Sequence, residues 1–186
     1  MIKLSIALAL IFWVQPSQQK LTKTKIGDYI TVSLPENFYA MSPQDIAQRY
    51  PSVRNPIGAY SNDERLVDFS VNISATRWRS TDIDIAKDFF KASIVNLYDR
   101  VDFIKEEIKV INDKRYIIFE FDSRINGDQY TLDKKEAVRT YTYVQYLLIN
   151  GKTIVFSFNA PTRIKDKWTA RAAEIMNSIK VKNNIE

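Results

Sequence analysis

The chain has 186 residues, of which 45% are hydrophobic and 26% are charged, as is typical of one globular domain that is large enough to bury a core. It contains no cysteine and no histidine, which excludes disulfides, thiolate ligands, a thiol nucleophile and the commonest general base and zinc ligand. The formal charge of +5 is spread along the chain among acidic residues, so it indicates mild basicity and no nucleic-acid footprint.

The amino terminus has the layout of a signal peptide. Lys3 precedes an apolar run from Leu4 to Val14, and polar residues follow as far as Gln19. The charged, hydrophobic and cleavage regions of a signal peptide come in this order. The run is too short to span a bilayer, which takes about 20 residues. We therefore expect residues 1–19 to be a signal peptide and residues 20–186 to form a single domain, with no transmembrane span in the mature chain.

This interpretation implies an exported protein, located in the periplasm or outside the cell. No Ala-x-Ala site follows the apolar run, so the cleavage site is left open. The alternative for the same segment is a helix buried in a cytosolic protein.

Alternation of apolar and polar residues predicts half-buried strands in the first half of the chain, at Asp28–Leu34, Ile57–Ser61 and Leu66–Ala75. The segment Gln18–Lys25 is interpreted as a polar lead. Ser42-Pro43 offers an N-cap and a proline at the first helical position, which predicts a short helix that ends near Tyr50.

A long helix and a hairpin follow. Ser80, Thr81 or Asp82 is expected to cap a helix that runs to about Tyr98. Residues at three- and four-residue intervals form its apolar stripe, which comprises Ala86, Phe89, Phe90, Ile94 and Leu97. The turn residues Asn112-Asp113-Lys114 then predict a hairpin of Phe103–Ile111 and Arg115–Ile125, followed by an exposed loop at Asn126–Glu136.

The clearest pattern lies in the last third. Two apolar segments, Val138–Ile149 and Lys152–Asn159, flank Asn150-Gly151. A type I′ turn needs positive φ at both central residues, which Asn and Gly tolerate best, so a hairpin is predicted. Pro161 is then expected to start an amphipathic helix, whose buried stripe comprises Ile164, Trp168, Ala172, Ile175 and Ile179.

The last helix carries the first candidate for a partner-binding site. Arg163, Lys167 and Arg171 recur at four-residue intervals and form a basic stripe. Such a stripe suits a lipid headgroup, a polysaccharide or an acidic protein. A charged helix face also serves simply to stay solvated, which is the competing explanation.

The second candidate is Arg77-Trp78-Arg79, which precedes the long helix. A tryptophan between two arginines can stack on a sugar ring or anchor a protein contact. The competing explanation is that Trp78 closes the edge of the core while both arginines point outward.

Other polar and aromatic groups favour structural roles. Tyrosines on the predicted strands suggest an aromatic platform, but aromatic residues also favour strands for packing; they are Tyr116, Tyr130, Tyr141, Tyr143 and Tyr146. Asp82, Asp84 and Asp88 lie early in a helix, where carboxylates complement the macrodipole, and they lack the spacing of a calcium loop. We assign no catalytic residue, no metal site and no cofactor.

The order of elements resembles the PsbP-like family. The resemblance covers about Ile26 to Val181 and rests on a first strand ending in Leu34-Pro35-Glu36-Asn37-Phe38, and on a final helix ending in Asn177-Ser178-Ile179-Lys180-Val181. It implies an α+β fold with an antiparallel sheet between helices, in a family of photosynthetic extrinsic subunits, Ran-binding relatives and bacterial periplasmic proteins. Those members are mainly binding or assembly factors, and no functional residue transfers from them.

Three hypotheses about function follow. The leading one is an exported, non-catalytic accessory protein that binds or stabilises another envelope protein. An alternative is a module that binds carbohydrate or an anionic polymer. A second alternative is a hydrolase that uses paired carboxylates or a serine and a lysine, since such partners can meet in space from distant positions.

Overall fold

The computed structural model describes residues 19–50, 55–127 and 136–183. Its strands are β1 (Leu21–Ile26), β2 (Ile30–Pro35), β3 (Phe38–Ala40), β4 (Gly58–Asn62), β5 (Asp68–Ile73), β6 (Arg100–Ile111), β7 (Lys114–Ile125), β8 (Val138–Ile149), β9 (Lys152–Pro161) and β10 (Lys180–Val181). Its helices are α1 (Pro43–Arg49), α2 (Ile83–Leu97) and α3 (Lys165–Asn177), with short 3-10 turns at Ser80–Asp82 and Thr162–Ile164. None of the helices in these ranges is long and apolar enough to cross a membrane.

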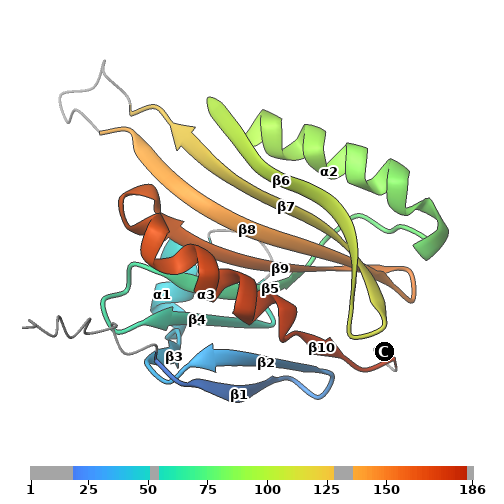
Figure 1. Cartoon of the computed structure of the whole chain (residues 1–186), viewed down its shortest axis with the longest axis horizontal. Helices are drawn as coiled ribbons and strands as arrows, with labels where there is room; N and C mark the ends of the chain where they lie inside the picture. Colours follow the sequence, from blue (N-terminus) through green and yellow to red (C-terminus); the bar gives the residue numbers. More distant parts are fainter. Residues whose placement is uncertain (1–18, 51–54, 128–135, 184–186) are drawn as a thin grey trace, which may run out of the picture.

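The strands form two antiparallel sheets with α3 packed between them (Figure 1). The larger sheet has the order β3-β4-β5-β9-β8-β7-β6, and the smaller has the order β1-β2-β10. Helix α3 contacts β8, β9 and β2, whereas α2 contacts β6 and β7. The two helices cover opposite faces of the larger sheet, because they share separate hydrophobic clusters with alternate residues of β7. This is the predicted α+β fold, with an antiparallel sheet between helices.

Both predicted hairpins are confirmed, and their turns have the expected backbone. Asn150 and Gly151 have φ of 51° and 68°, and Ile149 pairs with Lys152. Asn112 and Asp113 also have positive φ, of 47° and 64°. The type I′ geometry matches the twist of the flanking strands, so each turn sets the register of a long strand pair. Most of the predicted loop at 126–136 lies outside the described residues.

The smaller sheet was not predicted. Strand β1 lies in the segment interpreted as a polar lead, and among its residues only Ile26 is buried. A strand at the edge of a small sheet needs few apolar residues, so its sequence carries little alternation. Strand β10 has two residues and pairs Lys180 with Thr31, too short a pattern to recognise.

Helix α2 differs from its prediction in both cap and buried stripe. No side chain caps its first turn, since Asp82 is at the N-cap position but makes no capping bond. Ile83, Ala86, Phe90 and Ile94 face the sheet, whereas Phe89 and Leu97 are 43% and 69% exposed. Residues at three- and four-residue intervals can belong to either side of a helix when both sides are apolar, and this ambiguity caused the error.

The predicted buried stripe of α3 is confirmed. Ala172, Ile175 and Ile179 are fully buried, and Ile164 and Trp168 pack against the same cluster. Pro161, expected to start the helix, instead ends β9 and precedes a 3-10 turn. Beyond α3, the Ser178 hydroxyl accepts a hydrogen bond of 2.8 Å from the Ser33 amide of β2.

This contact yields a prediction about stability. Replacing Ser178 by Ala leaves the part-buried Ser33 amide unpaired, which should lower the free energy of unfolding by about 1–3 kcal/mol in urea titrations. Ser93→Ala is the matched control, because the Ser93 hydroxyl only donates to the Phe89 carbonyl one turn earlier in α2. Equal stability changes in the two variants would contradict this role for Ser178.

Candidate functional site

The Arg77-Trp78-Arg79 segment lies beside the turn of the β8–β9 hairpin. The three residues line a surface hollow of about 390 Å³ together with Asp82, Asn150, Gly151 and Lys152. Both arginines are exposed, and Arg79 Nε lies 3.1 Å from Asp82 Oδ2. Arg77 and Lys152 take part in none of the ion pairs found among the described residues. The hollow therefore has a positively charged rim.

Trp78 connects this hollow to the outward side of α2. Its ring centroid is 5.4 Å from that of Phe89 and 6.4 Å from that of Phe90, so one contact is with an exposed ring and the other with a buried one. Ile85, Phe89 and Ala92 recur at intervals of four and three residues, and all three are exposed. We call the set Trp78, Ile85, Phe89 and Ala92 the α2 surface.

The outward side of α2 is unusual because it is apolar. Ile85 is 66% exposed, although the opposite side of the same helix already buries Ile83, Ala86, Phe90 and Ile94. A helix on the surface of a soluble domain normally has a polar outer side. Clustered apolar residues beside charged ones are typical of a surface that contacts another protein.

The cations of the predicted basic stripe on α3 differ in their exposure. Arg163 lies in the 3-10 turn before the helix and is exposed, as is Lys167. The Arg171 side chain is only 14% exposed, and its Nη1 lies 2.5 Å from Glu174 Oε2. Lys165 is held by Asp122 at 2.5 Å, which raises the pKa of the Lys165 ammonium. Two of the predicted cations, Arg163 and Lys167, thus remain accessible to a partner.

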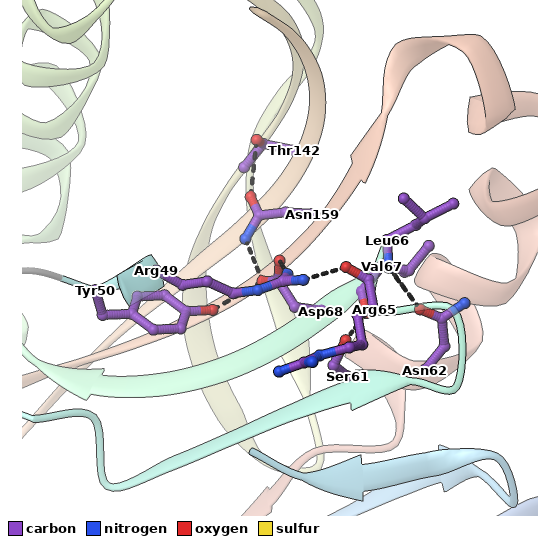
Figure 2. A network of polar contacts seen from close by, with 10 residues as sticks. All are labelled: Arg49, Tyr50, Ser61, Asn62, Arg65, Leu66, Val67, Asp68, Thr142 and Asn159. Carbon is purple, nitrogen blue, oxygen red and sulfur yellow. Dashed lines mark hydrogen bonds and ion pairs between the residues drawn. The ribbon is translucent and has the colours of Figure 1, made fainter. Parts of the chain in front are cut away.

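A polar network around Asp68 was not anticipated. Figure 2 shows the Asp68 carboxylate between side chains of α1, the residue after α1, and β9. Its Oδ1 accepts hydrogen bonds from Tyr50 Oη at 2.8 Å and Asn159 Nδ2 at 2.9 Å, and its Oδ2 accepts one from Arg49 Nη1 at 3.2 Å. Asn159 is held in turn by the Thr142 hydroxyl at 3.0 Å.

Burial decides the electrostatics of this network. Asp68 is 9% exposed, and the loss of water raises the pKa of its carboxyl, against the hydrogen bonds from Asn159 and Tyr50 and the charge of Arg49. Burial also raises the pKa of the Tyr50 hydroxyl, and the neighbouring Asp68 carboxylate raises it further. Tyr50 therefore stays protonated and acts as a donor.

The network attaches α1 to the larger sheet. None of the residues of α1 is buried, so apolar packing contributes little to its position. Instead, Arg49 and Tyr50 bond Asp68, and Arg65 forms an ion pair with Asp45. Alternation along the predicted strand assigned Asp68 and Ser70 to a wet face, but α1 and its neighbours cover that face and Ser70 is fully buried. The spacing of residues along the strand does not show that α1 covers this face.

A second buried polar group lies under α3. Glu120 is 4% exposed; its Oε1 accepts a hydrogen bond of 2.8 Å from Tyr141 Oη, and its Oε2 lies 3.5 Å from Lys105 Nζ. Two residues further along β7, Asp122 pairs with Lys165. The hydrolase alternative needs two carboxylates that act together, whereas Glu120 and Asp122 each lie in an ion pair with a lysine.

The tyrosines and aspartates considered as candidates in the sequence form no site in the described residues. Tyr116, Tyr141 and Tyr143 are buried in the core, and Tyr146 lies in the cluster on the other face of the sheet, so none of these tyrosines forms a surface platform. Tyr130 lies outside the described residues. Asp82, Asp84 and Asp88 form no metal-binding group, nor does any other set of acidic residues in the described ranges.

Comparison with known proteins identifies the fold. No protein-family model and no curated protein sequence matches the chain. Its structure is similar to that of PsbP from the cyanobacterium Synechocystis, at 15% identity over 94% of this chain and 99% of that chain, with a TM-score of 0.54. The Ran-binding protein Mog1p of Saccharomyces cerevisiae shares 15% identity over 88% and 96% of the two chains, with a TM-score of 0.55.

A third similar structure is LpqN of Mycobacterium tuberculosis, at 11% identity over 88% of this chain and 91% of that chain, with a TM-score of 0.52. LpqN is described as involved in cell envelope biogenesis. The predicted PsbP-like resemblance is thus confirmed at the level of the fold. At these identities the similarity leaves the function of this chain open.

The Asp68 network gives a second prediction. Asp68→Ala removes the acceptor of three side chains and leaves a part-buried arginine unpaired, so it should cost about 2–4 kcal/mol of unfolding free energy. Hydrogen exchange should accelerate first in α1. Asp102→Ala is the control, because Asp102 forms an exposed pair with Arg100 and its loss should cost less than about 1 kcal/mol. Unchanged exchange in α1 would show that the network does not hold this helix.

Proposed function

We propose that this chain is a non-catalytic binding protein of the cell envelope, which docks an envelope protein through the α2 surface. The observation that carries the proposal is the outward side of α2, where Ile85 and Phe89 are 66% and 43% exposed while the inward side is fully packed. Burying these side chains in a partner removes apolar area from water, which is the main driving force of protein association.

The surroundings of the α2 surface indicate the chemistry of the partner. Trp78 packs on the ring of Phe89 at an interplanar angle of 54° and adds an aromatic anchor of the kind that dominates interface energetics. Arg77 and Lys152 supply positive charge at one end of the surface. The complementary partner presents an apolar patch, with acidic side chains at the end that meets Arg77 and Lys152.

The fold neighbours support a binding role. Mog1p is described as a Ran-binding protein and LpqN as involved in envelope biogenesis, and neither description states an enzymatic activity. In this chain, Glu120 and Asp122 are each paired with a lysine, and Asp68 is paired with Arg49. These features favour an accessory protein over the hydrolase alternative.

A second candidate function is the binding of an acidic carbohydrate. It rests on the hollow of about 390 Å³, in which the indole of Trp78 lies beside Arg77, Arg79 and Lys152. Such a site would hold a sugar ring against the indole and a carboxylate or sulfate against the cations. Arg77→Ala with Lys152→Ala would abolish glycan binding, whereas a partner held chiefly by apolar contacts would be weakened only modestly.

Site-specific cross-linking tests the proposed interface. A photoreactive amino acid at Ile85 should give an adduct with one envelope protein in living cells, and Phe89→Asp should lower its yield about tenfold, because a charge in the buried centre of an interface costs at least about 1.4 kcal/mol. The same probe at Tyr39, which is 61% exposed on β3, is the control. Equal adduct yields from the two positions, or no effect of Phe89→Asp, would refute the interface.

Export is tested separately. Residues 1–19 are proposed as the signal peptide, so cell fractionation should recover the mature chain outside the cytoplasm, and amino-terminal sequencing should locate the cleavage site. A variant with Leu8 and Leu10 changed to Arg should remain in the cytoplasm at full length, because charge interrupts the apolar run. Recovery of the unprocessed wild-type chain in the cytoplasm would reject export.

A further inference from the structure

Strand β6 is a long edge strand with one free side. It pairs with β7 over nearly its whole length, and it is the last strand in the order of the larger sheet. In the part of the chain that the structure describes, no other strand pairs with β6. Its outward N–H and C=O groups therefore form a template for another strand.

A bulge divides this edge into two parts. The pairing register with β7 shifts between Phe103 and Lys105, and regular pairing continues from Lys105 to Ile111. A bulge bends a strand and interrupts its ladder, so only the second part offers a regular edge. That part has the sequence Lys-Glu-Glu-Ile-Lys-Val-Ile.

The side chains of this part alternate between the two faces of the sheet. Glu107 and Lys109 lie on the α3 face, since their partners on β7 are Ile118 and Tyr116 of the cluster on that side. Ile108 lies on the α2 face, where its partner is Ile117. If two copies join their edges antiparallel about a two-fold axis perpendicular to the sheet, each residue meets one from the same face.

We propose that a second copy of this chain pairs with β6 in the register centred on Ile108. In this register Ile108 lies opposite Ile108 of the second copy on the α2 face. On the α3 face, Glu107 lies opposite Lys109 of the second copy, and the symmetry repeats this pair. Opposite charges placed across two strands stabilise the pairing, and apolar residues do so as well.

Charge disfavours the neighbouring symmetric registers. Centring on Lys105 or Lys109 places each lysine opposite itself, and centring on Glu106 or Glu107 does the same for a glutamate. Centring on Val110 avoids like charges but pairs only the three residues up to Ile111. The Ile108 register combines the longest regular pairing with two complementary ion pairs. The Lys109 ammonium already bonds Asn177 Oδ1 at 3.3 Å and has further donors for the glutamate.

The pairing would join the two larger sheets edge to edge. Because the axis keeps each face on its own side, both α2 helices would lie on the same face of the joined sheet. The dimer would then present two α2 surfaces on one face, with the two helices antiparallel, independently of whether these surfaces bind an envelope protein.

Charge exchange tests the proposal on the purified chain, with light scattering after gel filtration as the readout. Wild-type chain should be dimeric, and Glu107→Lys or Lys109→Glu alone should raise the dimer dissociation constant roughly tenfold or more, because either change puts like charges opposite each other twice. An equal mixture of the two variants should restore dimers, since each lysine then meets a glutamate. This rescue distinguishes lost pairing from misfolding.

Cross-linking provides an independent readout, because the chain contains no cysteine. With Ile108→Cys, the two cysteines would lie directly opposite each other, with Cα atoms roughly 4.5–5.5 Å apart, which permits a disulfide. With Val110→Cys, they would lie roughly 13 Å apart along the strands, so oxidation should give little covalent dimer. A monomeric wild type would overturn the proposal, as would dimers that persist in both charge variants or cross-link equally at both positions.

Discussion

The packing of α3 between the two sheets is the contact on which the rest of the fold depends. Ala172, Ile175, Met176 and Ile179 are fully buried there. Trp168 lies 5.7 Å from Phe38 of β3 and 5.8 Å from Phe158 of β9, measured between ring centroids, so one side chain joins two strands of the larger sheet. The contact with Phe38 links residues that are more than a hundred positions apart. It can form only when the chain is nearly complete. The terminal strands β1 and β10 are held to β2 by antiparallel pairing.

This packing decides which surfaces stay available. The α3 face of the larger sheet is covered by a helix and by a second sheet. Glu120 is paired there with Tyr141 and Lys105, whereas the Gln145 amide and the Tyr116 hydroxyl have no hydrogen-bond partner in the described part of the chain. Among the described residues, the opposite face is covered by α2 over β6 and β7, by Trp78 beside α2, and by α1 near β5. Both proposed interaction surfaces, the outward side of α2 and the edge of β6, lie on this side or at its border, where no further element of the described residues covers them.

Different interactions hold different parts of the domain in place. The larger sheet and α3 are held by hydrophobic clusters, whereas α1 is held by Asp68, Arg49 and Tyr50 without burying a residue of its own. Hydrogen bonds to a buried carboxylate are directional, so they specify the position of α1 more strictly than apolar contact would. Because α1 buries no residue of its own, it should detach from the sheet more easily than α2 or α3.

The amino-acid sequence by itself determined the elements whose signals are local. Asn150-Gly151 and Asn112-Asp113 specify turns through their tolerance of positive φ, and the stripe from Ile164 to Ile179 specifies a buried helix face through its period. Only the tertiary structure decided which side of α2 is buried, that Asp68 lies inside, and that the Arg171 side chain is largely covered while Arg163 stays exposed. The physical reason is that burial and ion pairing depend on neighbours distant in the sequence, whereas periodicity and turn chemistry depend on adjacent residues.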